Sequence, residues 1–237
     1  MKRSVESWSR PCWSRADGPK LGICNYSVAD LAKYFDICEA KGYVKPTVIQ
    51  GLYNAVYREW ETELFPLLRK HNCVFYAYRY LPSLLLLLLS TCSCRLQIAH
   101  ADNTSPLAGG FLTGKLTFPP AREDNALEGT RWRGESTMPV YPKLFDTPPM
   151  HEAMKLLKAA CDAASPLISL QEASLRWLMH HSALREGDAI IVGAKRVDQL
   201  EANVADARKG PLPQAVVDVF DKIHEILADQ PKLHNSF

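Results

Sequence analysis

The chain has 237 residues, of which 47% are hydrophobic and 23% are charged, and its formal net charge is +2. This composition is typical of a folded globular protein and excludes a wholly disordered chain. The small net charge argues against a nucleic-acid-binding protein, because such a domain needs a strongly basic face. The length allows one large domain or two small ones.

The cysteines and the apolar runs indicate a cytoplasmic protein. Seven cysteines are scattered without a C-x-x-C pair, which favours free thiols in a reducing compartment over a disulfide scaffold or a zinc site. Residues 1–19 are polar and aperiodic, so we expect an irregular N-terminal tail and no signal peptide. The apolar run 84–89 is far shorter than the ~20 residues that a membrane span needs, so no membrane partner is expected.

From residue 20 onward, short β-type runs alternate with amphipathic helical runs. The sequence predicts strands over 21–24, 47–51, 73–78 and 188–193. It predicts helices between Ser27 and Gly42, and over about 60–71, 150–164, 169–179, 197–208 and 214–227. Strands separated by helices favour an α/β fold of βα units around a parallel sheet.

Two internal segments do not follow this alternation. Residues 117–149 are rich in proline, glycine and charge, and we expect them to form one long loop. Residues 79–104 contain LPSLLLLLLSTCSC and show neither helical punctuation nor strand alternation. We therefore expect a disordered or irregular insertion there.

Short motifs for other chemistries are incomplete. GGFLTGK at residues 109–115 begins like a phosphate-binding P-loop, but Leu116 stands where a magnesium-binding hydroxyl is needed, so nucleotide hydrolysis is disfavoured. Glycines in this stretch can still let backbone N–H groups approach a phosphate. The adjacent His180 and His181 point in different directions on a helix, so no metal site is expected.

Residues suited to ligand binding lie at the ends of all four predicted strands. Asn25 follows the first strand, Gln50 and Tyr78 end the second and third, and Gly193, Lys195 and Arg196 lie at the end of the fourth. In a βα barrel the carboxyl ends of the strands share one rim, where active sites form. An amide pair beside an aromatic ring can hold a planar carboxamide, and a glycine loop with basic side chains can hold phosphates.

Three separated stretches carry a family resemblance. Residues 25–78, 105–115 and 172–212 occur in the order found in the aldo-keto reductases, and they resemble in particular the aflatoxin-aldehyde and succinic-semialdehyde reductases and their fungal relatives. The resemblance implies a (β/α)8 TIM barrel that reduces small aldehydes and ketones with NADP(H). This chain would then be a partial barrel made of about the last four βα units.

The resemblance also implies a set of cofactor-binding residues. They are Cys24, Asn25, Gln50 and Tyr78 at the nicotinamide, Ser105, Pro106, Leu107, Ala108, Gly109, Gly110, Gly114 and Lys115 at the pyrophosphate, Arg131 in the long loop, and Lys195, Arg196, Gln199 and Asn203 at the 2′-phosphate and adenine. The family usually has Ser at the position of Cys24, and close relatives often have Ser at that of Lys195. The basic pair at 195–196 favours NADP over NAD.

The family's catalytic Asp, Tyr, Lys and His lie in the first four βα units, whereas this chain is expected to begin at the fifth. No catalytic residue is therefore assigned, and a truncated chain is expected to be inactive as written. The alternative is a non-enzymatic nucleotide-binding or regulatory subunit of the same fold. A half barrel leaves strand edges unpaired, so a homodimer is a further expectation.

The domain organisation follows from the resemblance. Residues 20–237 would form one incomplete aldo-keto reductase domain, interrupted by 79–104. In relatives, the sequence before the interruption runs directly into SPLAGG, which suggests a retained intron. The alternative is a true surface insertion, and the transcript sequence across this point distinguishes the two.

Overall fold

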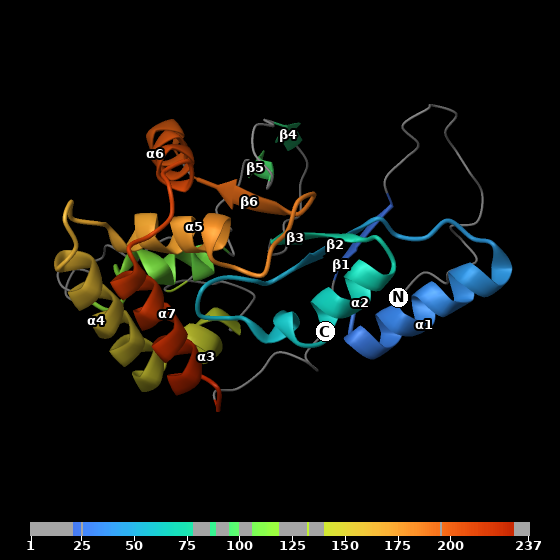
Figure 1. Cartoon of the computed structure of the whole chain (residues 1–237), viewed down its shortest axis with the longest axis horizontal. Coiled ribbons are helices and arrows are strands. Elements are labelled where there is room, and N and C mark those ends of the chain that lie inside the picture. Colours follow the sequence, from blue (N-terminus) through green and yellow to red (C-terminus); the bar gives the residue numbers. More distant parts are fainter. Residues whose placement is uncertain are drawn as a thin grey trace.

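The computed structural model describes residues 21–24, 26–77, 86–88, 95–99, 106–118, 132, 140–194 and 196–229. The predicted tail 1–19 lies outside these residues, as do much of 79–104 and most of 119–139. The described part of the chain forms strands and helices around one sheet (Figure 1).

The predicted elements occur in the predicted order, together with others that the sequence did not predict. They are β1 (Gly22–Cys24), α1 (Val28–Lys41), β2 (Val48–Gly51), the 3-10 helix η2 (Glu59–Glu61), α2 (Leu64–Lys70), β3 (Val74–Ala77), β4 (Leu86–Leu88), β5 (Arg95–Ala99), the 3-10 helix η3 (Ala108–Thr113), α3 (Val140–Phe145), α4 (Pro148–Asp162), α5 (Leu170–His180), β6 (Ala189–Gly193), α6 (Val197–Ala207) and α7 (Gln214–Ile226). Each strand and helix expected from the sequence has a counterpart. The helix expected over 60–71 begins only at Leu64, because Trp60 lies in η2.

Local capping signals explain where two of the helices begin. The Ser27 hydroxyl accepts a hydrogen bond from the Asp30 N–H at 3.1 Å, and the Ser169 hydroxyl accepts one from the Glu172 N–H at 3.0 Å. Gly42 ends α1 with φ +66°, a left-handed conformation that glycine adopts without a steric penalty. These bonds satisfy terminal backbone groups that would otherwise lack partners.

The sheet has the strand order β1-β2-β3-β6-β5-β4. Strands β1, β2, β3 and β6 are parallel neighbours, which confirms the predicted α/β class with parallel strands. Alternate residues of these strands, including Ile49, Phe75 and Ile190, face a hydrophobic core shared with the helices. The residues between them face the opposite side of the sheet.

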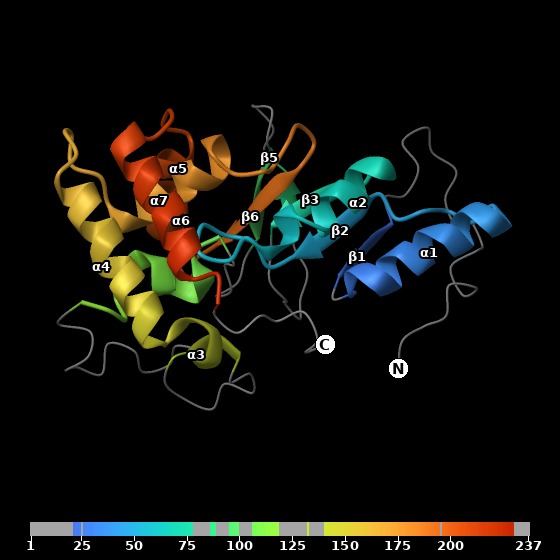
Figure 2. The ribbon, with the colours of Figure 1, turned by 60° about the horizontal axis from the view of Figure 1, so that its bottom comes forward.

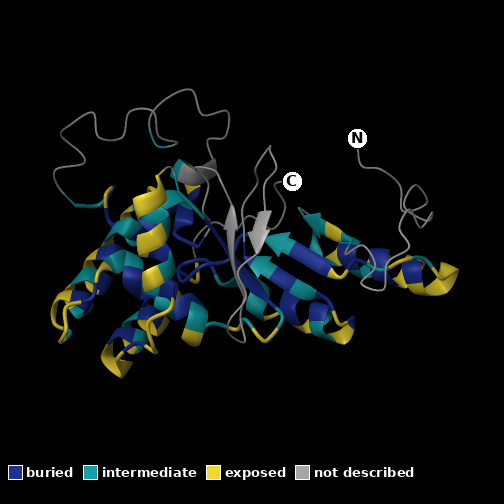
Figure 3. Cartoon of the chain, turned by 90° about the horizontal axis from the view of Figure 1, so that it is seen from above, coloured by how far each residue is buried: buried dark blue, intermediate teal, exposed yellow. Residues whose placement is uncertain are grey.

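The helices form two groups beside the strands. In Figures 1 and 2, α1 and α2 lie along β1–β3, and α4, α5 and α7 gather at the other end of the molecule. Helix α4 packs against α7, and α5 packs against α6. Buried residues follow the strands and the inward sides of the helices (Figure 3). None of the helices in the described ranges is long and apolar enough to cross a membrane.

The expectation of an irregular insertion is wrong for part of residues 79–104. Residues 86–88 form β4 and residues 95–99 form β5, which pair with each other in antiparallel fashion. Strand β5 also pairs in parallel with β6 along its whole length, from Arg95 opposite Ala189 to Ala99 opposite Gly193. The side-chain pattern did not predict these strands, because pairing at an open strand edge uses backbone groups and needs no particular alternation of side chains.

The expectation of one long loop over 117–149 is also wrong at its C-terminal end. Helix α3 occupies residues 140–145, and α4 begins at Pro148. Leu144 and Phe145 are buried in the core, so tertiary packing stabilises a helix too short to be stable alone. The sequence analysis counted Pro148 among the residues of the loop, but proline is well suited to the first position of a helix.

Candidate functional site

A row of side chains crosses the parallel strands on the face opposite the helix-packed core. Cys24 pairs with Gln50, and Gln50 pairs with Tyr76, so these three residues are direct neighbours along the sheet. All three are half-buried. The structure therefore brings together Cys24 and Gln50, two of the residues expected at a nicotinamide.

Tyr76 was missed by the sequence analysis. It precedes the predicted Tyr78 by two residues, and alternate residues of a strand share a face. Counting back by that period from Tyr78 would have placed Tyr76 beside Gln50. Tyr78 itself lies outside the described residues, as do Asn25, Ser105, Arg131 and Lys195.

Cys24 stands in this row as a neutral thiol. Burial raises the pKa of the Cys24 thiol above its usual value, so the group is protonated near neutral pH. A thiol is a weaker hydrogen-bond donor than the hydroxyl that the family usually has here. The Gln50 amide is the stronger polar group of the pair, because it both donates and accepts.

The expected pyrophosphate loop is a tight turn that contains four residues in left-handed conformations. Ala108, Gly109, Gly110 and Gly114 have φ values of 50°, 67°, 93° and 82°. Pro106, Leu107 and Ala108 are buried, and Gly109 and Gly110 are half-buried. Leu107 and Ala108 belong to the hydrophobic core, whereas the two glycines are partly exposed. Lys115 is exposed at the end of the turn.

The P-loop alternative fails at Leu116. This side chain is 7% exposed and belongs to the hydrophobic core, so the position of the magnesium-binding hydroxyl carries a packing residue. Gly114 is also constrained, because a Cβ atom there would lie 2.6 Å from Cδ1 of Leu170. The end of the loop is thus shaped by packing against α5.

One contact from outside holds the backbone of the loop, and a second set of contacts lies just beyond its end. The indole N–H of Trp132 donates to the Gly109 carbonyl at 3.0 Å, and its ring lies 6.2 Å from that of Phe111. Thr117 Oγ1 lies 2.9 Å from Nδ1 of His151, whose Nε2 lies 2.8 Å from an Asp146 oxygen. Trp132 was not expected at the site; its only sequence signal is an aromatic residue directly after Arg131.

Two of the expected residues lie in helix α6, and a third directly precedes it. Gln199 and Asn203 are spaced i and i+4, so they share one face of the helix, and Arg196 is its N-cap with an extended backbone. Arg196 is exposed, Gln199 is half-buried and Asn203 is 4% exposed. The amide side chains of Gln199 and Asn203 can both donate and accept hydrogen bonds.

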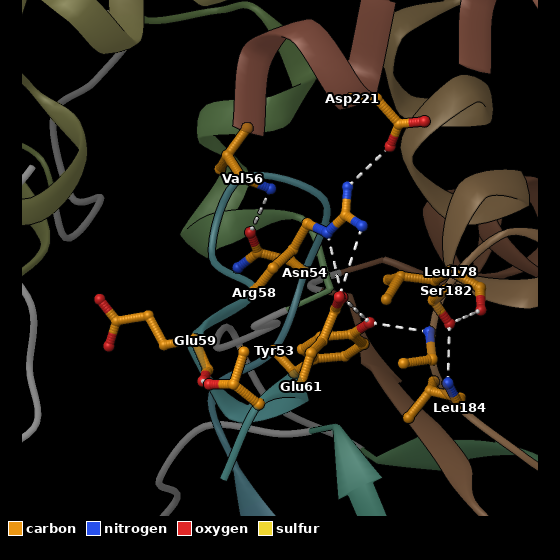
Figure 4. A network of polar contacts seen from close by, with 12 residues as sticks. Tyr53, Asn54, Val56, Arg58, Glu59, Glu61, Leu178, Ser182, Leu184 and Asp221 are labelled. Atoms are coloured by element: carbon orange, nitrogen blue, oxygen red, sulfur yellow. Dashed lines mark hydrogen bonds and ion pairs between the residues drawn. The ribbon is translucent and has the colours of Figure 1, made fainter. Parts of the chain in front are cut away.

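A polar network holds the loop that follows Gln50 (Figure 4). The buried Tyr53 hydroxyl donates to Glu61 Oε1 at 2.7 Å and accepts from the Ala183 N–H at 3.0 Å. Arg58 Nε donates to Glu61 at 3.0 Å, and Arg58 Nη1 donates to Asp221 of α7 at 3.0 Å. The network ties the loop to α7 and to the segment before β6, which fixes where β2 ends.

His180 and His181 both have structural partners. His180 Nε2 lies 2.6 Å from the Lys209 carbonyl, and His181 Nε2 accepts from the Leu212 N–H at 2.9 Å. In the described ranges, no group of three His, Cys, Asp or Glu side chains is placed to hold a metal ion. The two rings join α5 to the turn that precedes α7.

The bond to Leu212 predicts a pH dependence of stability. Burial and then the neighbouring His180 lower the pKa of His181 below its usual value of 6.5, so the folded state binds this proton less readily than the unfolded state. Stability should therefore fall as the pH drops below about 7. Urea unfolding of the wild type and of His181→Gln at several pH values checks this. Equal slopes in both proteins between about pH 7 and 5 would contradict the assignment.

Comparison with known proteins identifies the family of the chain. Residues 88–225 match the family model described as the aldo/keto reductase family. The chain belongs to the aldo/keto reductase family. It is 36% identical over 217 residues to human aflatoxin B1 aldehyde reductase member 2, which covers 89% of this chain and 52% of that protein.

Other relatives give the same result. Human aflatoxin B1 aldehyde reductase member 4 is 36% identical over 217 residues, covering 89% of this chain and 56% of that protein. An aldo-keto reductase of Pseudocercospora fijiensis (strain CIRAD86) is 32% identical over 211 residues, covering 88% of this chain and 60% of that protein. The chain thus spans about half the length of these curated relatives, from 52% to 60%.

Proposed function

We propose that this chain is the coenzyme-binding part of an NADP(H)-dependent aldo-keto reductase that reduces aldehydes or ketones. The observation that carries the proposal is the in-register row formed by Cys24 and Gln50 at the carboxyl ends of β1 and β2. Gln199 and Asn203 on one face of α6, with Arg196 at its N-cap, support it, because α6 directly follows β6 of the same sheet. When bound, NADPH supplies the hydride for carbonyl reduction.

The proposed binding roles follow from the chemistry of the described groups. The Gln50 amide, with the weaker Cys24 donor, orients the nicotinamide carboxamide. The Gly109 and Gly110 backbone approaches the pyrophosphate, and the exposed Lys115 supplies positive charge. Arg196, Gln199 and Asn203 would hold the 2′-phosphate and the adenine.

The same proposal includes the architecture. Strands β1, β2, β3 and β6 would be the last four strands of a (β/α)8 barrel, because they are parallel neighbours and three of their connections contain helices. Ligand sites of such barrels lie at the carboxyl ends of the strands. By the family resemblance, the catalytic Asp, Tyr, Lys and His belong to units that precede β1. We therefore propose that these 237 residues bind the coenzyme without donating the proton.

Three further parts of the proposal rest on other features. The free thiols Cys38, Cys73 and Cys161 suit the reducing cytoplasm. The names of the relatives are those of aldehyde reductases, which favours a small carbonyl substrate. No feature of the described residues favours a regulatory subunit. The homodimer stays a prediction, and one that uses the far edge of β6 would have to displace β5.

A coenzyme titration tests the proposal. We expect the fluorescence of NADPH to change saturably when the full chain is added, and Gln50→Leu to weaken binding by about tenfold through loss of hydrogen bonds to the carboxamide. Gln214→Leu is the matched control, because Gln214 is exposed at the start of α7, outside the proposed site. An aldehyde should not consume NADPH in the presence of this chain alone.

Each outcome is informative. Absence of NADPH binding would disprove the coenzyme role, whereas measurable turnover would show that the chain carries its own proton donor. Equal weakening by Gln50→Leu and Gln214→Leu would show that the row at the end of β1 and β2 does not contact the coenzyme.

A further inference from the structure

The start of α6 places an acidic residue beside a proposed coenzyme ligand. Arg196 is the N-cap of the helix, and Asp198 lies in its first turn. Arg196 Nε donates to Asp198 Oδ1 at 2.9 Å, and Arg196 Nη2 donates to Asp198 Oδ2. The side chains are 67% and 64% exposed, so the pair stands at the surface within reach of a ligand.

The pair uses the donors that a phosphate would need. Two parallel N–H donors of a guanidinium bind either a carboxylate or a phosphate in the same forked geometry. The hydrogen bond from Arg196 lowers the pKa of the Asp198 carboxyl, so this group is ionised at neutral pH. Its carboxylate therefore occupies the position at Arg196 that an incoming phosphate group would take.

We propose that Asp198 is a specificity-determining residue that competes with the coenzyme 2′-phosphate for Arg196 and so limits the preference for NADPH over NADH. The inference rests on the proposed function. An exposed ion pair is weak, so the 2′-phosphate can displace the carboxylate from the guanidinium. After the exchange, the displaced carboxylate stays in the same helical turn and repels the phosphate.

NADH lacks the 2′-phosphate, so it does not compete with Asp198 for Arg196. NADH carries a hydroxyl group at that position, which neither requires the guanidinium fork nor suffers charge repulsion from Asp198. The contacts proposed for Gln199 and the buried Asn203 are common to both coenzymes. Asp198 should therefore change the affinity for one coenzyme and leave the affinity for the other nearly constant.

A purely structural role of Asp198 predicts a different result. An acidic residue in the first turn stabilises a helix through the dipole, so its loss would loosen α6 and weaken both coenzymes together. Asp198→Asn keeps the size of the side chain and its capacity to accept hydrogen bonds. The ratio of the two affinities, measured beside the melting temperature, separates the two roles.

The experiment measures the dissociation constants of NADPH and NADH for the full chain by fluorescence titration. For Asp198→Asn we expect NADPH to bind about threefold to tenfold more tightly, and NADH to change less than about twofold, as removal of one nearby like charge in a solvated site predicts. Glu201→Gln is the matched control, because Glu201 is an exposed carboxylate in the next turn of α6. The gain for NADPH should shrink at high salt, and it should vanish when Asp198→Asn is combined with Arg196→Met.

Other results overturn the inference. Equal tightening of both coenzymes, a similar gain from Glu201→Gln, or weaker NADPH binding by Asp198→Asn would each exclude competition at Arg196. If the wild type binds NADPH and Asp198→Asn leaves the ratio unchanged, the inference fails and the proposed function stands. If the wild type binds neither coenzyme, both fail.

Discussion

Replacing Asp188 by asparagine is expected to lower the free energy of unfolding by about 3 to 5 kcal/mol, the range for breaking a buried ion pair. Asp188 is fully buried at the start of β6. Its carboxylate accepts from both terminal nitrogens of Arg69 in α2, and from the backbone N–H groups of Phe75 and Arg185, at 2.8 Å each. Asparagine presents an NH₂ group to these donors in place of one oxygen, and Arg69 loses its compensating charge.

Urea unfolding measures this effect. Asp218→Asn is the matched control, because Asp218 is exposed on α7 and accepts only a surface hydrogen bond from Gln214 at 2.8 Å. We expect less than about 0.5 kcal/mol from the control, the usual range for a surface change. A loss below about 1 kcal/mol for Asp188→Asn would show that the four donors find water or other partners, and that the carboxylate is not what joins α2, β3 and β6.

The sequence predicted the features of the fold that depend on neighbours in the chain. Ser27, Ser169 and Gly42 cap helices through bonds to residues a few positions away, so the order of residues alone indicates them. Strand β5 and helix α3 have no such signal. β5 forms because the edge of β6 is available, and α3 forms because Leu144 and Phe145 reach the core.

The sequence predicted those parts of the candidate site whose residues follow the periodic spacing of a helix or a strand. The pair Gln199 and Asn203 follows the helical repeat, and Gln50 lies at the end of a predicted strand. The bond from Trp132 to Gly109 and the ion pair from Arg69 to Asp188 join segments far apart in the sequence. No local pattern encodes such contacts, because they depend on how the elements pack.

The loop after Gln50 provides the second large effect. Arg58→Met is expected to destabilise the chain by about 1.5 to 3 kcal/mol, the range for losing hydrogen bonds to charged groups, because the pair with Glu61 is only partly buried. The Arg58 side chain is 14% exposed and pairs with Glu61 and Asp221, and its guanidinium lies 4.8 Å from the ring of the buried Trp177. Methionine can keep the packing on the indole ring but leaves Glu61, which is 21% exposed, without its cation.

Lys155→Met is the matched control for this substitution, since the Lys155–Glu152 pair is 58% and 64% exposed and should contribute little. Because the network in Figure 4 fixes the loop that begins directly after Gln50, Arg58→Met should also weaken NADPH binding at temperatures where the protein is still folded. Loss of stability with unchanged NADPH affinity would separate the two effects: the network would hold α7 against the loop without setting the position of Gln50. Unchanged stability would mean that Glu61 is satisfied by Tyr53 alone, whose hydroxyl donates to it at 2.7 Å.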